Sequence, residues 1–202
     1  MQTEQKNGPA TAWIHQLQEA PPCLVMTGTS GYSYQEWVDC GFYPPGTRTA
    51  SMLDLYGRSF SVVELNYTWY QMARSDVLTR MLGAAPGHIV FAAKLTRTVT
   101  HEREDDWRDQ VQHYCRGIVA LGKRLVAVLV QLPPAFDRTI ANRCFLAELL
   151  DCLQKLPVAV EFRHVSWAVD SVFAELERRR ITLVSVDEPE LPGLFPRLDV
   201  VT

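Results

Sequence analysis

The chain has 202 residues, of which 47% are hydrophobic and 21% are charged. This composition is typical of a globular protein, and the length supplies one sizeable core, so we expect a single folded domain. The formal net charge is only −3 at pH 7. Such a charge provides no bulk attraction to nucleic acid or to an anionic membrane, although it does not exclude a local basic patch.

The cysteines and the N-terminal segment together predict the compartment. The five cysteines are an odd number and include no CxxC pair, so they predict free thiols rather than a disulfide framework or a zinc knuckle. Residues 1–22 lack the basic start and apolar run of a signal peptide, and no apolar window is long enough to span a bilayer. We therefore expect a cytoplasmic protein without a membrane partner, with a flexible tail over residues 1–22 and one domain over residues 23–202.

Short apolar runs alternate with amphipathic segments along the rest of the chain. The apolar runs are rich in Val, Leu and Ile, as strands covered on both faces should be. They span residues 23–28, 61–66, 88–95, 125–132, 158–162 and 181–187. Helical patterns lie between them at residues 49–58, 75–83, 104–125, 140–154 and 169–180.

This alternation predicts a parallel sheet with right-handed crossovers, which leaves a doubly wound sheet or a (β/α)8 barrel. No GxGxxG or GxxxxGK[ST] motif follows the first strand, so the best sign of a nucleotide-binding doubly wound fold is missing. The regular repeat of about 30 residues favours the barrel. Since the sequence predicts about six strands and a full barrel takes about 250 residues, we expect an α/β, TIM-type barrel with about six of its eight strands.

Polar side chains follow every predicted strand, at the edge where parallel α/β folds bind their ligands. They are Thr29 and Ser30, Glu64 and Asn66, Lys94, Gln131, Glu161 with Arg163 and His164, and Asp187 with Glu188. Because side chains alternate along a strand, Glu64 and Asn66 share a face, and so do Glu161 and Arg163. If these faces line a barrel mouth, carboxylates, amides and cations converge there.

A structural role for the same residues stays open. Glu64 and Lys94 on neighbouring strands can form an ion pair that has no catalytic duty. Since Arg163 and His164 are consecutive, we expect His164 to turn away from the mouth towards the loop that carries Trp167. A glycosidase-type pair of Glu64 and Glu161 is disfavoured, because neighbouring cations favour the ionised form of both and one of them must be a proton donor.

Six segments together resemble the YecE-like proteins, a domain family of unknown function. The segments are GTSGYSYQEW, GFYPPG, VELNYTWY, FAAKLTRTVTH, LVQLPPAF and VAVEFRHVSW, and the resemblance covers residues 24 to about 200. Thr96 and Val165 stand where the family usually has Pro, and Tyr67 replaces a smaller residue. The resemblance implies a TIM-type barrel but supplies no reaction.

The resemblance also implies a set of motif positions and a shortened C-terminus. The positions are Gly28, Ser30, Tyr34, Trp37, Glu64, Asn66, Tyr70, Lys94, His101, Gln131, Pro133, Glu161, Arg163, His164 and Trp167. In the family a strand of the type YVRLHG, a helix and a last strand usually follow the point where this sequence stops. We therefore expect a C-terminally shortened member whose first and sixth strands are open edges that favour self-association.

The leading hypothesis is an enzyme-like barrel with a site for an anionic or sugar-like small molecule at the strand ends. The expected catalytic residues are Glu64, Lys94, Glu161 and Arg163. The expected ligand-binding residues are Ser30, Tyr34, Trp37, Asn66, Tyr70, His101, Gln131, His164, Trp167 and Asp187. No metal ligand and no cofactor is assigned.

Three alternatives remain. A metal-dependent phosphodiesterase- or isomerase-like barrel would hold Mg or Mn with Glu161, Asp187 and His164. A nucleic-acid-binding module would use the loop cations, including Arg97 and Arg103, with neighbouring aromatic rings, which the net charge does not favour. The chain can also be a truncated fragment without activity.

Overall fold

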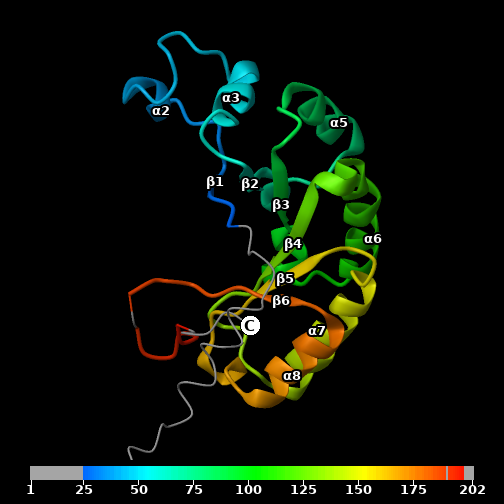
Figure 1. The fold of residues 1–202 in the computed structure, drawn as a ribbon. Helices are drawn as coiled ribbons and strands as arrows, with labels where there is room; N and C mark the ends of the chain where they lie inside the picture. Colours follow the sequence, from blue (N-terminus) through cyan, green and yellow to red (C-terminus); the bar gives the residue numbers. More distant parts are fainter. Residues whose placement is uncertain (1–24, 190, 198–202) are drawn as a thin grey trace, which may run out of the picture.

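The structure, a computed structural model, describes residues 25–189 and 191–197. Its centre is one parallel sheet of six strands in the order β1-β2-β3-β4-β5-β6 (Figure 1). The strands are β1 (Gly28–Ser30), β2 (Val62–Leu65), β3 (Val90–Lys94), β4 (Leu125–Gln131), β5 (Val158–Glu161) and β6 (Thr182–Leu183). The predicted tail over residues 1–22 lies outside the described residues.

Helices connect successive strands, as the alternating pattern predicts. They are α2 (Glu36–Asp39), α3 (Thr49–Tyr56), α4 (Tyr67–Tyr70), α5 (Ser75–Ala84), α6 (Trp107–Ile118), α7 (Ile140–Cys152) and α8 (Asp170–Arg179). A π-helix spans Thr98–Glu102, and 3₁₀ turns span Val119–Arg124 and Val165–Trp167. The long helices α5 to α8 lie along one side of the sheet (Figure 1). No helix among the described residues has the length and apolarity that crossing a bilayer takes.

The strand sequences explain which face of the sheet packs against the helices. Val63 and Leu65 of β2 are buried, as are Phe91 and Ala93 of β3, and they belong to one core with residues of the long helices. Because side chains alternate along a strand, the intervening residues turn to the opposite face, where burial is only partial. The sheet is therefore apolar towards the helices and polar at the carboxyl end of its other face.

The prediction of six parallel strands is confirmed, but a closed barrel is not shown. β1 and β6 are the two ends of the strand order, and the described residues do not pair them with each other. A TIM-type barrel closes with eight tilted strands. The described residues therefore form an open sheet with the strand order that such a barrel has over six strands.

The two end strands differ from their predicted positions. The first strand was expected over residues 23–28, but β1 begins at Gly28, and Val25 is 79% exposed. The last was expected over residues 181–187, but β6 is limited to Thr182–Leu183. Each has one neighbouring strand, so half of its backbone groups have no strand to pair with. The inner strands β2 to β5 lie within the predicted ranges.

The chain returns to the end of β5 after leaving β6. The backbone N–H of Phe195 donates to the carbonyl of Arg163 at 2.9 Å, and the N–H of Val165 donates to the carbonyl of Gly193 at 2.9 Å. The ring of Phe195 also stacks on Phe162. Residues 191–197 therefore lie beside the carboxyl end of β5, next to the predicted site.

Candidate functional site

The strand-end cluster is a group of polar side chains at the carboxyl ends of the strands. Its members are Ser30, Glu64, Asn66, Lys94, Gln131, Glu161, Arg163 and Glu188, and each contacts at least one other member. The contacts divide the cluster into one network on β1 to β3 and another on β4 and β5.

Glu64 is the centre of the first network. Its carboxylate Oε1 accepts a hydrogen bond from Ser30 Oγ at 2.6 Å and lies 3.3 Å from Lys94 Nζ. Asn66 Nδ2 donates to Ser30 Oγ at 2.6 Å. The strand register explains the arrangement, because Ser30 pairs directly with Glu64. The predicted Glu64–Lys94 ion pair is therefore present, with the carboxylate side chain 25% exposed.

The end of β3 is fixed by hydroxyl groups that the sequence did not single out. The backbone carbonyl of Lys94 accepts hydrogen bonds from Thr68 Oγ1 at 2.7 Å and from the Tyr114 hydroxyl at 3.0 Å. Thr68 and Tyr114 are both fully buried, and burial raises the pKa of Tyr114 above its ordinary value. Lys94 therefore starts from a rigid backbone position, and its ammonium group is directed to Glu64.

Glu161 is the centre of the second network. Its Oε1 accepts hydrogen bonds from Gln131 Nε2 at 2.7 Å and from Arg163 Nε at 2.5 Å. Gln131 and Glu161 are direct partners in the parallel register, and Arg163 follows on the same side as Glu161, as alternation predicts. The Glu161 side chain is only 7% exposed, so it depends on these two donors for its solvation.

Arg163 links Glu161 to a residue beyond β6. Its Nη1 lies 2.5 Å from Glu188 Oε2. The neighbouring Asp187, the residue predicted for this site, instead pairs with Arg197 at 3.1 Å, and its side chain is 80% exposed. The two are consecutive in the chain, and Glu188 is the one that contacts Arg163. The sequence marked this pair of acids but could not tell which of them faces Arg163.

The charges of the cluster do not balance. Two cations, Lys94 and Arg163, are in contact with three carboxylates, Glu64, Glu161 and Glu188. Both cations already have a carboxylate partner within 4 Å, and Arg163 has two. The cluster therefore carries one excess negative charge and presents carboxylate and amide groups rather than an unpaired cation.

An aromatic group borders Lys94. The His101 ring lies edge-to-face against Trp69 with 5.3 Å between centroids, and Trp69 lies in the same way against Tyr70 at 4.7 Å. Burial, followed by the positive charge of Lys94, lowers the pKa of His101 below its ordinary value. His101 and Tyr70 are thus linked through Trp69, whose indole Nε1 is buried without a hydrogen-bond partner among the described residues.

The two predicted tryptophans lie in aromatic packing. Trp37 contacts the rings of Tyr34, Phe42, Tyr43 and Tyr56. Trp167 is 3% exposed, stacks between Phe136 and Phe162, and donates Nε1–H to the carbonyl of Phe136 at 2.7 Å. The indole ring of Trp167 is therefore packed against two neighbouring rings and has little exposed surface.

Tyr34 and His164 border the cluster without joining its side-chain networks. The Tyr34 hydroxyl donates to the backbone carbonyl of Ser30 at 2.5 Å. His164 turns towards the loop that carries Trp167, where its Nδ1 accepts a hydrogen bond from the Ser166 backbone N–H at 3.2 Å. The orientation expected for His164 is the one found.

The residues considered for a divalent ion do not form a group. Within residues 25–189 and 191–197, no three His, Cys, Asp or Glu side chains are placed to hold a metal ion. Glu161 binds Arg163, Asp187 binds Arg197, and His164 binds Ser166. These three residues therefore face different partners.

Comparison with known proteins gives the family and the fold. A family model described as "Protein of unknown function DUF72" matches residues 26–202. The UPF0759 protein YunF of Bacillus subtilis is 26% identical over 151 residues, which are 71% of this chain and 52% of the relative. The chain thus spans about half the length of that curated relative.

Solved structures of DUF72 family proteins have a similar fold. One from Thermotoga maritima shares 33% identity with a TM-score of 0.71, covering 86% of this chain and 68% of that chain. One from Enterococcus faecalis shares 22% identity with a TM-score of 0.71, covering 86% and 64%. The second likeness concerns the fold alone.

Proposed function

Because the chain belongs to the DUF72 family of proteins of unknown function, its function has to come from its site, and we propose that the strand-end cluster binds a neutral, sugar-like small molecule. The resemblance noted in the sequence is to the same family under another name. Parallel α/β proteins bind their ligands at this end of the sheet, which supports the location. The choice of a neutral ligand over an anionic one rests on the charges of the cluster.

The observation that carries the proposal is the excess of carboxylates. An anionic group at Lys94 or Arg163 would have to displace Glu64 or Glu161 and would meet like charge. A hydroxyl group can donate to a carboxylate and accept from an ammonium or amide group at the same time. The amides of Asn66 and Gln131 add donors and acceptors beside the charges. This pattern suits a polyhydroxylated ligand better than a phosphate.

If the site is catalytic, Glu64 is the general base that the arrangement supports best. Its side chain is 25% exposed, whereas that of Glu161 is 7% exposed and engaged by two donors. The Glu64 carboxylate also lies 3.3 Å from Lys94 Nζ, so a cation stands beside the oxygen atoms that would accept a proton. In this assignment Glu161 positions Gln131 and Arg163 and does not touch the ligand.

Ligand-observed NMR with the neutral sugars glucose, ribose and xylose and with their phosphate esters tests the proposal. We expect saturation transfer to neutral sugars, no tighter binding of the esters, and binding weakened by about tenfold in Glu64→Gln, which keeps the shape and removes the charge. Glu148→Gln is the matched control, because Glu148 pairs with Arg108 on the helical surface. Tighter binding of the phosphate esters, above all in Glu64→Gln, would show an anion site instead, and no sugar binding by the unmodified chain would contradict the proposal.

The nucleic-acid alternative gains no specific support. Arg97 is paired with Glu102 at 3.1 Å, and Arg103 donates to Asn142 Oδ1 at 2.6 Å and lies over the ring of Phe136. These loop cations therefore already have partners in the fold. The alternative with Mg or Mn has no observation in its favour either, and self-association through the sheet edges stays a prediction.

A further inference from the structure

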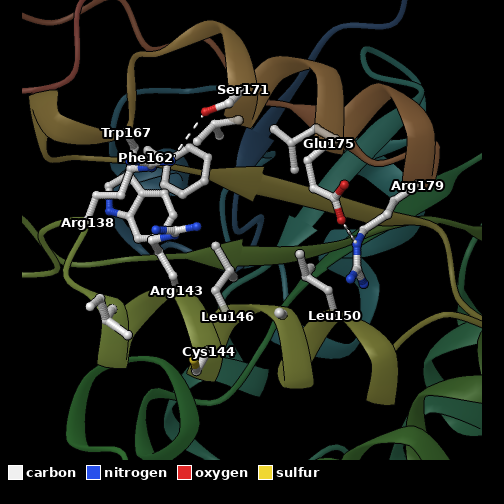
Figure 2. A pocket seen from close by; sticks show the side chains of 14 residues that line it. Arg138, Arg143, Cys144, Leu146, Leu150, Phe162, Trp167, Ser171, Glu175 and Arg179 are labelled. Atoms are coloured by element: carbon white, nitrogen blue, oxygen red, sulfur yellow. Dashed lines mark hydrogen bonds and ion pairs between the residues drawn. The ribbon is translucent and has the colours of Figure 1, made fainter.

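A cavity lies between α7 and α8, on the helical side of the sheet (Figure 2). It has a volume of about 630 Å³, which is within the range of small-molecule sites. Its walls are mainly apolar, with Leu146, Leu150, Phe162, Val172 and Leu176 among the lining residues. It shares no lining residue with the strand-end cluster, so it is a separate place for a ligand.

Two arginines stand at the end of this cavity where α7 begins. Neither Arg138 nor Arg143 has a carboxylate within 4 Å among the described residues. Figure 2 shows the Arg143 side chain reaching from α7 towards the rings of Phe162 and Trp167. The N-terminal end of α7, at Ile140, also lines this part of the cavity and adds positive potential.

Arg138 is the most informative of these residues. Its Nη2 donates to Ser171 Oγ at 3.3 Å, but its Nε is buried and has no hydrogen-bond partner among the described residues. A buried donor without a partner is costly, and one on a guanidinium group is more so. Arg138 and Arg143 both line the cavity, so an anionic group in it would pair with both guanidinium groups.

The other end of the cavity is already neutralised. Arg179 pairs there with Glu175 at 2.6 Å and with Asp151 at 2.5 Å, and Figure 2 shows the Glu175–Arg179 pair away from Arg138 and Arg143. The cavity therefore has one cationic end, an apolar middle and a balanced far end. A ligand that matches it has a single negative group and an apolar body.

We propose that the cavity between α7 and α8 binds a small amphipathic monoanion, a carboxylate with an aliphatic or aromatic body. The carboxylate lies between Arg138 and Arg143 and pairs with both guanidinium groups. The apolar body lies between the two helices against Leu146 and Leu176. This inference does not depend on the proposed sugar-like ligand of the strand-end cluster.

The thiol of Cys144 provides a local measurement, because Cys144 is exposed and lines the cavity. The rate of N-ethylmaleimide labelling is measured by peptide mapping in the presence of octanoate, with the exposed Cys40 as the internal reference. We expect octanoate to slow labelling of Cys144 and not of Cys40, and octan-1-ol at equal concentration to protect less. In Arg143→Gln the octanoate concentration for half protection should rise by about tenfold. Arg116→Gln, on the surface of α6, is the matched control and should leave it unchanged.

Equal protection by octan-1-ol and octanoate, or unchanged protection in Arg143→Gln, would overturn the proposal. Protection that follows the protein concentration rather than the octanoate concentration would mean that a second copy covers the cavity, which also overturns it. Ala147→Phe checks the site independently, since Ala147 lines the cavity and a larger side chain there should abolish octanoate protection. Circular dichroism of each variant verifies that it remains folded.

Discussion

Replacing Gly117 with alanine should destabilise the protein, although the same change in a helix normally stabilises. Gly117 is buried in α6, and a Cβ there would lie 1.9 Å from the backbone carbonyl oxygen of Ala73 and 2.6 Å from its carbon. The clash is with backbone, so it cannot be relieved by a rotamer change. Ala73 precedes α5, and the contact sets how closely that loop approaches α6.

The magnitude follows from two opposing terms. Alanine gains about 1 kcal/mol over glycine in a helix interior. Overpacking a close contact costs about 1–3 kcal/mol and sometimes more, and a 1.9 Å approach to backbone belongs at the upper end. We therefore expect Gly117→Ala to lower the free energy of unfolding by about 2 kcal/mol, measured by urea denaturation followed by circular dichroism.

Gly83→Ala is the matched control. Gly83 lies in α5, and a Cβ there would have no atom within 4 Å. The same substitution should raise the free energy of unfolding by about 0.5–1 kcal/mol. A Gly117→Ala variant as stable as the unmodified chain, or an equal loss in Gly83→Ala, would refute the close-contact argument.

Three further predictions concern charge and association. Lys94→Met should raise the pKa of His101, because it removes a repelling positive charge. The pKa should stay below its ordinary value, because burial is the larger cause of the lowering. NMR titration of the imidazole ring measures this pKa, and an unchanged value would contradict the electrostatic effect of Lys94. Hydrogen bonds from Arg178 and Arg179 hold the pKa of Glu175 at about 2, so its contribution to stability is present above pH ~4.5 and lost as the pH falls towards 2. Glu175→Gln should therefore make the thermal unfolding midpoint less dependent on pH over that window. The effect should be modest because the Glu175 side chain is 43% exposed, and the same pH dependence in the variant and the unmodified protein would count against the pairing. Self-association through the sheet edges should raise the sedimentation coefficient as the protein concentration increases. Thr182→Lys on β6 should reduce this rise, whereas Thr79→Lys on α5 should not. A monomer at all concentrations would contradict the prediction.

The inner part of the fold was predictable because its signals are local. The inner strands are near-continuous apolar runs, and the five predicted helices fall where apolar residues repeat with helical spacing. In the helix predicted over residues 104–125, Trp107, Val111, Tyr114, Ile118 and Leu121 recur three or four residues apart, and all five are buried. The bounds of the two outer strands were not predictable in the same way, because the lengths of β1 and β6 depend on pairing with a single neighbouring strand each.

The candidate site was also predictable only in part. Polar residues after each strand were visible in the sequence, and the parallel register of Ser30 with Glu64 and of Gln131 with Glu161 brings them together. Trp167 was expected among the ligand-binding residues, and in the structure its ring stacks on Phe136 and Phe162 and is 3% exposed. A single sequence shows that an aromatic residue follows a strand, not whether its ring has free space.

The sequence by itself determined the parallel α/β class and the row of polar strand ends, because periodicity and side-chain alternation are properties of neighbouring residues. Only the tertiary structure decided that Arg163 binds Glu188 rather than Asp187, and that Arg138 and Arg143 line one cavity between α7 and α8. These features join residues that lie far apart in the chain. They follow from how the elements pack, which no local pattern specifies.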